Sequence, residues 1–394
     1  MSQYKKIYLK KGKEESLLRY HPWIFSGALH HVDEGIEEGD IVRVVNAKGE
    51  FMAVGHYQDG SIAVRVLSFS DVAIDASFWE SRLSSALGMR LAIGLARHDG
   101  VGNNAYRLVH GEGDHLPGLI IDVYGQTAVM QAHSIGMHRN RHDIVDALMK
   151  VMGGLISHVY YKSETTLPFM EPENGFIVGG SDDNTASENG LLFHVDWLRG
   201  QKTGFFIDQR ENRALLERYA QGRRVLNMFC YTGGFSFYAM RGGAAVVHSV
   251  DSSAKAIELT KANVELNFPH DPRHEAYCED AFKYLEQRGD GYDLIILDPP
   301  AFAKHRGALH NALKGYTRLN EKAFEKIEKG GILFTFSCSQ VVTKDHFRNA
   351  VFTAAAQAHR KVRILHQLHQ PADHPVNIYH PEGEYLKGLV LYVE

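Results

Sequence analysis

The stretch that decides the fold is residues 225–234, which read Val-Leu-Asn-Met-Phe-Cys-Tyr-Thr-Gly-Gly. An apolar run of strand length ends here in a turn of small residues, and a helical pattern follows at 235–241. Small residues let the backbone approach a ligand closely, and the amides at a helix start favour the anionic parts of that ligand. The stretch lacks the GxGxxG spacing of a dinucleotide site. By itself, such a turn is more often only a tight strand–helix connection.

Acidic residues follow the next two candidate strands and strengthen the ligand-binding interpretation. Asp251 ends the strand predicted at 246–250 and comes 17 residues after Gly234. An acid at this place can accept hydrogen bonds from both hydroxyls of a ribose. Asp280 ends a third candidate strand and could bind an adenine amino group, although it is also a good N-cap for the helix that follows. Together these residues predict an adenosyl cofactor.

Two further predicted strands end in residues that could take part in a reaction. The apolar run 293–297 leads into Asp298-Pro299-Pro300, where the prolines stiffen the chain and hold the carboxylate at the ligand crevice. The alternative is a rigid turn with a solvated carboxylate.

The run 332–336 leads into Cys338, whose thiol beside the cofactor suggests covalent attack on a pyrimidine. From the residues alone, that role and an inert buried thiol are equally open. We assign Cys230 and Cys278 to packing.

Outward from this region, the chain divides into three predicted domains: 1–72, 73–190 and 191–394. The first contains short β-rich segments and predicts a small barrel-like module. The second mixes helical and strand patterns, and the third alternates strand and helix, which predicts a parallel, doubly wound sheet. The predicted strands lie at 6–9, 41–45, 51–55, 62–67, 118–124, 128–131, 158–161, 225–229, 246–250, 293–297, 332–336, 362–369 and 388–393, and the helices at 78–95, 141–151, 235–241, 254–266 and 314–328.

Composition fits a globular protein of 394 residues, with 44% hydrophobic and 23% charged residues. No run approaches the roughly 18 apolar residues of a membrane span, and the first residues lack a signal-peptide core. Three widely spaced cysteines favour a reducing cytoplasm. The net charge of −4 counts mildly against a nucleic-acid binder, although a local basic groove remains compatible with it. His138 and His142 share a helix face without an acidic partner, so we expect no metal site.

Two further segments combine aromatic and charged residues. Residues 200–210 hold Lys202, Phe206, Asp208 and Arg210 before the first strand of the last domain. They could stack on a base and orient a substrate, or they could cover the edge of the sheet. In the first domain, Trp23 lies near several lysines and Arg19, a combination that suits RNA, although a core tryptophan with solvated charges is at least as good an interpretation.

The whole chain resembles the ribosomal large-subunit methyltransferase I family, which comprises RNA 5-methylcytosine enzymes. The motifs that carry the resemblance are His21-Pro22-Trp23-Ile24-Phe25-Ser26-Gly27, Tyr106-Arg107-Leu108, 111–118, Lys202-Thr203-Gly204, Asp208-Gln209-Arg210, 231–235, Asp298-Pro299-Pro300, Ser337-Cys338-Ser339, Ala372-Asp373-His374-Pro375 and Pro381-Glu382-Gly383.

The resemblance implies an N-terminal PUA domain, a central α+β domain and a Rossmann-like class I methyltransferase domain. It implies S-adenosylmethionine as methyl donor and a cytosine of 23S ribosomal RNA as acceptor. It makes Cys338 the expected nucleophile at cytosine carbon 6 and Asp298 the residue that binds the cytosine and favours its protonation at N3. The predicted cofactor-binding residues are Asn227, Phe229, Thr232, Gly233, Asp251, Ser252, Asp280 and Asp298, and the predicted substrate-binding residues are Trp23, Lys202, Phe206, Asp208, Arg210, Pro299 and Pro300.

One departure from the broader pattern of RNA cytosine methyltransferases concerns product release. Many of those enzymes carry a second cysteine directly after the proline of the Asp-Pro motif, where this chain has Pro300 and Ala301. The base that removes the carbon-5 proton is therefore not identified.

Two rival functions stay open, an amino-group methyltransferase and a non-catalytic RNA-binding assembly factor. The sequence leaves a homodimer open and does not specify which nucleotide is methylated or whether naked RNA is the substrate.

Overall fold

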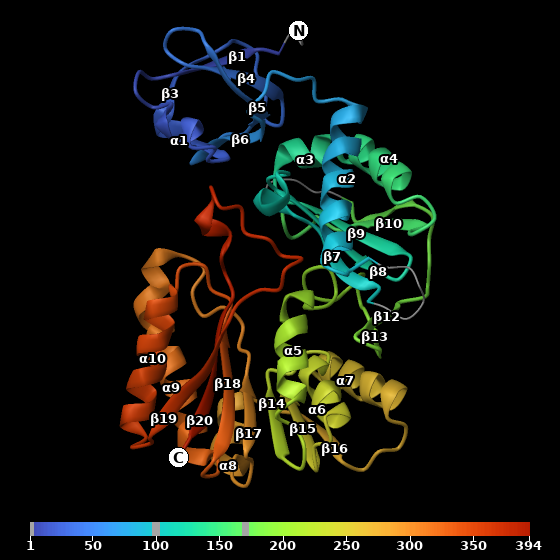
Figure 1. Cartoon of the computed structure of the whole chain (residues 1–394), viewed down its shortest axis with the longest axis vertical. Helices are drawn as coiled ribbons and strands as arrows, with labels where there is room; N and C mark the ends of the chain where they lie inside the picture. The colour runs from blue at the N-terminus through green and yellow to red at the C-terminus, as the bar shows by residue number, and fades with distance from the viewer. Residues whose placement is uncertain (1–3, 97–102, 168–172) are drawn as a thin grey trace. The chain divides into compact units, whose positions relative to one another are not determined.

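The computed structural model describes residues 4–96, 103–167 and 173–394 (Figure 1). Residues 1–3, at the start of the first predicted domain, lie outside these ranges. No helix in the described ranges is both long enough and apolar enough to cross a membrane.

The chain forms two compact units. Unit 1 consists of residues 1–190, 195–207 and 372–383, and unit 2 consists of residues 191–194, 208–371 and 384–394. Two segments after residue 190 therefore belong with unit 1, and the three-domain division remains a prediction from the sequence.

The first part of unit 1 is a six-stranded sheet in the order β2-β6-β5-β4-β1-β3. β1 runs parallel to β4, and the other neighbouring strands are antiparallel. Alternate apolar residues such as Ile7, Leu9, Val42 and Val44 point into one core. Four of the strands were predicted, whereas β2 has only three residues and β3 has two histidines at its centre, so neither gives a strand pattern. The elements are β1 Lys6–Leu9, α1 Glu15–Leu18, β2 Trp23–Phe25, η1 Ser26–Ala28, β3 Leu29–Val32, β4 Ile41–Val45, β5 Phe51–Tyr57 and β6 Ile62–Ser68.

The second part of unit 1 is a five-stranded sheet in the order β11-β10-β9-β8-β7, with α2 and α4 sharing its core. The helix predicted at 78–95 spans residues 76–92, because Asp75 caps it by accepting a hydrogen bond from Phe78 N at 3.1 Å. The elements are α2 Ala76–Ala92, β7 Ala105–His110, η2 Gly111–Asp114, β8 Leu119–Tyr124, β9 Thr127–Ala132, α3 Ile135–Arg139, α4 Arg141–Val151, β10 His158–Tyr161, β11 Gly175–Val178 and β12 Thr185–Glu188.

Residues 372–383 join unit 1 through buried polar contacts. The Asp373 carboxylate accepts from the backbone N of Arg107 at 3.0 Å, and its carbonyl accepts from Arg90 Nη2 at 2.8 Å. Arg90 is fully buried and also forms an ion pair with Asp114. A buried arginine with all of these acceptors keeps its charge compensated, so the late segment is held firmly against β7.

Unit 2 is built on a seven-stranded sheet in the order β16-β15-β14-β17-β18-β20-β19. The first five strands in this order are parallel, and β20 runs antiparallel to both β18 and β19. The elements are β13 Leu191–His194, η3 Ile207–Gln209, α5 Arg210–Glu217, β14 Arg224–Met228, α6 Gly234–Arg241, β15 Val246–Asp251, α7 Ala254–Asn267, β16 His274–Cys278, α8 Ala281–Arg288, β17 Leu294–Leu297, η4 Arg306–Ala308, α9 Leu309–Lys326, β18 Gly331–Ser337, α10 Lys344–Gln357, β19 Val362–Leu368 and β20 Lys387–Val393. Ile207, the first residue of η3, belongs to unit 1, as does η5 Pro381–Gly383.

Alternate residues of the central strands enter two different cores. Leu226 and Ile295 pack with residues of α8, α9 and α10, whereas Val225 and Ile296 pack with residues of α5, α6 and α7. This two-residue period is what a sheet covered on both faces requires. It confirms the predicted doubly wound sheet, whose carboxyl edge is the usual place for a ligand.

Candidate active site

The loop between β14 and α6 has an unusual backbone. Phe229 and Tyr231 have φ angles of 58° and 48°, which non-glycine residues rarely adopt, and Gly233 has a φ of 82°. A Cβ atom at Gly233 would lie 2.8 Å from Thr260 Cγ2. Such conformations persist only where the surroundings enforce them, and they gather at functional sites. The predicted residues Phe229, Thr232 and Gly233 therefore lie in a loop that is fixed before any ligand binds.

Neighbouring side chains hold this loop. Thr260 Oγ1 donates to the carbonyl of Tyr231 at 2.8 Å, and Asn263 Nδ2 donates to the carbonyl of Thr232 at 3.0 Å. Asp251, at the end of β15, accepts from the backbone N of Tyr231 at 3.0 Å and from that of Ser253 at 2.9 Å. Each carboxylate oxygen has a second lone pair, so Asp251 can still accept from a ribose hydroxyl.

The other predicted cofactor residues lie in different surroundings. Asp280 caps α8 by accepting from Lys283 N at 3.0 Å, and it is exposed, as is Ser252. Asn227 is buried inside the sheet, and its Nδ2 donates to Ser236 Oγ at 2.9 Å. Its Oδ1 is buried without a hydrogen-bond partner. The structure thus places Asn227 in a polar chain between strand and helix, while Asp251 and Asp280 lie at strand ends.

Asp298 directly follows β17 and lies beside two residues of the 208–210 segment. Its Oδ2 accepts from Gln209 Nε2 at 3.0 Å, and Gln209 Oε1 accepts from Asn212 Nδ2 at 2.6 Å. Burial and, second, the negative charge of Asp208 raise the pKa of Asp298 to about 7. The hydrogen bond from Gln209 and the charge of Arg213 oppose this shift. A carboxyl group with this pKa can both donate and accept a proton near neutral pH.

Asp208 provides a second acidic group. Its Oδ2 accepts from the Tyr385 hydroxyl at 2.8 Å, while its Oδ1 is buried without a hydrogen-bond partner. A buried carboxylate oxygen without a donor is costly and calls for an explanation, such as a group supplied by a ligand. Arg210, predicted to bind substrate, is 1% exposed and contacts Glu211 through Nε at 3.2 Å.

Cys338 follows β18, and polar contacts fix the residues on both sides of it. Ser337 Oγ donates to the Tyr316 hydroxyl at 2.9 Å, and Ser339 Oγ donates to the carbonyl of Ala303 at 2.5 Å. Lys387 Nζ donates to the carbonyls of Ser339 and Val342. The cysteine itself is half-buried and is a reduced thiol.

Lys387 and Tyr316 connect Cys338 electrostatically with its surroundings. Burial lowers the pKa of Lys387 to about 8, while the negative charge of a Cys338 thiolate acts in the opposite direction. The pKa of Tyr316 is raised to about 12, mainly by burial, with smaller contributions from Cys338 and Asp298. The Tyr316 hydroxyl therefore lies within electrostatic range of both predicted catalytic groups. By contrast, burial strongly raises the pKa of Cys230, which agrees with its assignment to packing.

The sequence did not single out Lys387 or Tyr316. A lysine directly before the predicted strand 388–393 is a usable signal for Lys387, whereas nothing local marks Tyr316. Pro299 is buried and Pro300 is exposed, as expected for a stiff exit from β17.

The predicted residues Trp23, Lys202 and Phe206 belong to unit 1. Trp23 is half-buried, and its Nε1 donates to Glu112 Oε1 at 2.8 Å.

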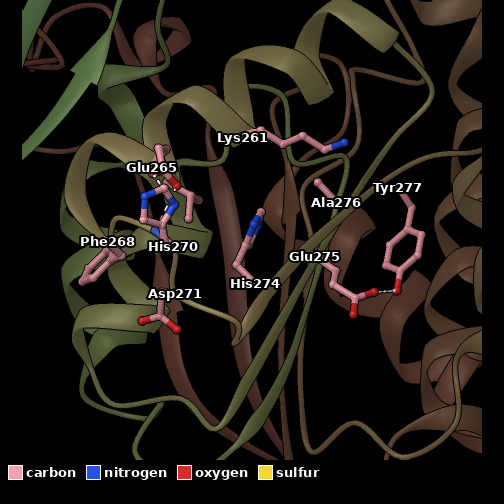
Figure 2. A pocket seen from close by; sticks show the side chains of 10 residues that line it. Lys261, Glu265, Phe268, His270, Asp271, His274, Glu275, Ala276 and Tyr277 are labelled. Carbon is pink, nitrogen blue, oxygen red and sulfur yellow. Dashed lines mark hydrogen bonds and ion pairs between the residues drawn. The ribbon is translucent and has the colours of Figure 1, made fainter.

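A hollow of about 380 Å³ lies elsewhere in unit 2, between α7 and β16 (Figure 2). Its labelled side chains include Lys261, His270, His274 and Tyr277, and none of the predicted cofactor residues lines it. The hollow is shallow, and β16 is an edge strand of the sheet. We therefore place the candidate active site at the strand ends and not in this hollow.

Comparisons with known proteins agree with this geometry. Residues 177–382 match the family model of S-adenosylmethionine-dependent methyltransferases, and residues 7–69 match that of PUA-like domains. Proteins called ribosomal RNA large subunit methyltransferase I are similar over the whole length. The one from Tolumonas auensis is 42% identical, with 98% of each chain covered, and that from Klebsiella pneumoniae is 38% identical, covering 100% of this chain and 99% of its own.

Two solved structures share the fold at 23% identity, each covering 98% of this chain and 99% of its own. One is described as an S-adenosylmethionine-dependent methyltransferase from Streptococcus mutans, with a TM-score of 0.84, and the other as a methyltransferase complexed with S-adenosylhomocysteine, with a TM-score of 0.85. The fold is thus a Rossmann-like methyltransferase with an N-terminal PUA-like domain, and the cofactor is S-adenosylmethionine.

Proposed function

The chain belongs to the ribosomal RNA large subunit methyltransferase I family, and from this we propose that it methylates carbon 5 of a cytosine in 23S ribosomal RNA through a covalent intermediate on Cys338. The observation that carries the proposal is that Cys338 and Asp298 follow the neighbouring parallel strands β18 and β17, within electrostatic range of the same Tyr316 hydroxyl. One cytosine ring could contact both groups from this edge of the sheet.

In the proposed reaction, the Cys338 thiolate forms a C–S bond to cytosine carbon 6. The electron pair of the 5,6 double bond shifts toward carbon 5, and a proton delivered to N3 makes this shift easier. Asp298, with a pKa of about 7, is suited to deliver that proton. S-adenosylmethionine supplies the methyl group that carbon 5 takes up. Loss of the carbon-5 proton to a base then expels the thiolate, breaks the C–S bond and restores the aromatic ring. The proton on N3 returns to the Asp298 carboxylate, and S-adenosylhomocysteine leaves as the demethylated donor.

Lys387 supports the thiolate form of Cys338 in this proposal. Its ammonium group donates to the carbonyl of Ser339, the residue after the cysteine, so the positive charge is held close to the thiol. A nearby cation stabilises a thiolate and lowers the thiol pKa. Because Lys387 acts through Cys338, we regard it as a positioning residue.

The rival function of amino-group methylation is less well supported by the geometry. It would use the aromatic residue after Asp298-Pro299-Pro300 to stack on the base. Phe302 instead packs on Tyr316, with ring centroids 4.6 Å apart and an interplanar angle of 36°. Amino-group methylation also gives no role to a thiol held between two anchored serines.

The PUA-like module is proposed to bind RNA. Lys10, Lys11 and Lys13 are exposed there, and lysines of this kind contact phosphates. Trp23 is less suited to base stacking, because its ring packs edge-on against His380 with centroids 4.3 Å apart. Replacing Lys11 and Lys13 by glutamate should weaken RNA binding and lessen its salt dependence while S-adenosylmethionine binding stays the same.

The function is tested by analysing methylated nucleosides in ribosomal RNA from cells with and without the gene. We expect 5-methylcytosine to disappear from 23S RNA when the gene is deleted and to return with the wild-type copy but not with Cys338→Ala. Loss of an N-methylated nucleoside instead would favour the amino-group rival. An unchanged nucleoside profile would favour an assembly factor.

A further inference from the structure

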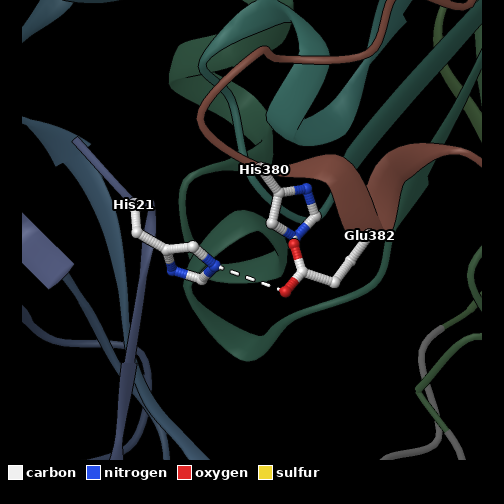
Figure 3. Close-up of side chains that lie close together, drawn as sticks. All are labelled: His21, His380 and Glu382. Carbon is white, nitrogen blue, oxygen red and sulfur yellow. Dashed lines mark ion pairs between the residues drawn. The ribbon is translucent and has the colours of Figure 1, made fainter. Parts of the chain in front are cut away.

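Three side chains from two segments that lie far apart in the sequence converge within unit 1. His21 precedes β2, while His380 and Glu382 belong to the segment 372–383 (Figure 3). One donor atom from each residue lies within 4.8 Å of the other two. Figure 3 shows both imidazole rings turned toward the Glu382 carboxylate. Neither the active site nor the proposed RNA contacts use this cluster.

His380 provides an independent reason to suspect a missing ligand. It is 2% exposed, and neither of its ring nitrogens has a hydrogen-bond partner. Its Nε2 lies 3.8 Å from Glu382 Oε2, which is beyond hydrogen-bond distance. A buried imidazole with both nitrogens unsatisfied is costly unless something else binds it.

The surroundings of His380 are acidic. Glu382 belongs to the cluster, and the Glu112 carboxylate accepts from Trp23 Nε1 at 2.8 Å, while the Trp23 ring packs against His380 with centroids 4.3 Å apart. The site thus combines an imidazole without a hydrogen-bond partner with two nearby carboxylates, and this combination suits a divalent metal ion.

His21 can take the tautomer that metal binding requires. Its Nδ1 lies 3.2 Å from the carbonyl oxygen of Trp23 and 3.2 Å from the backbone N of the same residue, so it can donate to the first or accept from the second. If Nδ1–H donates to that carbonyl, Nε2 is left with a lone pair, and this nitrogen lies 3.6 Å from Glu382 Oε1. Metal-binding histidines commonly fix their second nitrogen in this way.

The distances require only a small adjustment. Donor atoms about 2.0–2.1 Å from a tetrahedral Zn²⁺ are roughly 3.3 Å apart. The two nitrogen–oxygen distances, 3.6 Å to Glu382 Oε1 and 3.8 Å to Oε2, exceed this by a few tenths of an ångström, and the three donor atoms lie within 4.8 Å of one another. The Glu382 side chain is half-exposed and can close such a gap by changing its rotamer.

We propose that His21, His380 and Glu382 form a binding site for a divalent transition-metal ion of the Zn²⁺ class. Two imidazoles and one carboxylate form a set that leaves one coordination position for water. The ion joins the N-terminal β module to residues 372–383, which are themselves anchored to β7 through Asp373. The bound ion thus stabilises the packing of residues 372–383 within unit 1.

The test uses the untagged full-length protein, stripped of metal with a chelator and titrated with Zn²⁺ in a calorimeter. We expect one ion per chain, bound with micromolar or tighter affinity. His380→Ala and Glu382→Gln should each weaken binding by at least about 100-fold. His270→Ala is the matched control, because His270 forms an exposed pair with Glu265 at 3.1 Å and belongs to no cluster of three possible ligands among the residues that the structure describes. It should bind Zn²⁺ like the wild type.

This stabilising role is tested by measuring thermal unfolding and proteolysis. Saturating Zn²⁺ should raise the thermal midpoint of the wild type and of His270→Ala but not that of Glu382→Gln, and it should slow proteolysis within residues 372–383. If His380→Ala does not fold, as judged by circular dichroism, His21→Gln replaces it. The proposal is wrong if the wild type retains no Zn²⁺, or if both ligand variants bind it as tightly as the control.

Discussion

Asp298→Asn should make the protein more stable in weakly alkaline solution while removing its activity. The folded-state pKa of Asp298 is about 7, against 3.8 for an ordinary aspartate, so the folded state holds a proton that the unfolded state has lost. Between these values, stability falls as pH rises, because the native state binds more protons than the unfolded state. Asparagine keeps an oxygen that can accept from Gln209 Nε2 and has no charge to bury.

The magnitude follows from the size of the shift. A difference of 7 − 3.8, or about 3 pKa units, corresponds to roughly 4 kcal/mol at about 1.4 kcal/mol per unit. Because Asp298 is only half-buried, relaxation of its surroundings reduces this, and we expect about 2–4 kcal/mol. The advantage of the variant should be near zero at pH 4 and complete above pH 8.

The assay is thermal unfolding of the wild type and Asp298→Asn at pH 5 and pH 8, with Asp182→Asn, an exposed carboxylate, as the control. The midpoint difference between wild type and Asp298→Asn should grow clearly from pH 5 to pH 8, and the control should show no such growth. If the difference is independent of pH, or if the variant is less stable at pH 8, Asp298 is an ordinary ionised carboxylate. Its assignment as proton donor then fails.

Three further substitutions test the site. Cys338→Ala should fold and bind S-adenosylmethionine but lose methyl transfer by at least about 10³-fold, which corresponds to roughly 4 kcal/mol of activation barrier. It should also form no denaturation-resistant adduct with 5-fluorocytosine RNA, and an adduct mapped to another cysteine would refute the mechanism. Asp251→Ala should weaken S-adenosylmethionine binding by roughly 1–3 kcal/mol in calorimetric titration, and unchanged affinity would remove it from the site. Lys387→Met should raise the pH at which iodoacetamide alkylates Cys338, whereas an unshifted alkylation profile would show that the lysine does not act on the thiol.

The parallel sheet of unit 2 was predictable because its strands are buried on both faces. Runs such as 294–297 are then apolar throughout, and a polar residue that marks the edge of the sheet follows each of them. The residues that this edge presents, including Asp251, Asp298 and Cys338, were identified on that ground. Strands β2 and β3 gave no comparable signal, since β2 has three residues and the centre of β3 consists of the exposed His30 and His31.

The partners of the site residues were not predictable. Gln209 approaches Asp298 from a helix entry, and Tyr316 comes from the middle of α9, so only the tertiary fold brings them to the strand ends. The raised pKa of Asp298 depends on this burial and on Asp208, which local sequence does not encode. Residues 372–383 likewise gave no sign that they pack with unit 1, because long-range contacts leave no periodic pattern.

The place of β20 in the sheet bears on when the candidate site is completed during synthesis of the chain. β20 lies between β18 and β19, with Lys387 opposite Ser337, although it follows every other strand of the sheet along the chain. Domains generally fold during synthesis from the N-terminal side, at roughly 5–20 residues per second. The thiol, the carboxylate and the cofactor loop are therefore all synthesised before the strand that brings the lysine to them. A nascent chain without β20 lacks the strand that pairs with both β18 and β19, so we expect methyl transfer to begin only after this strand has been synthesised.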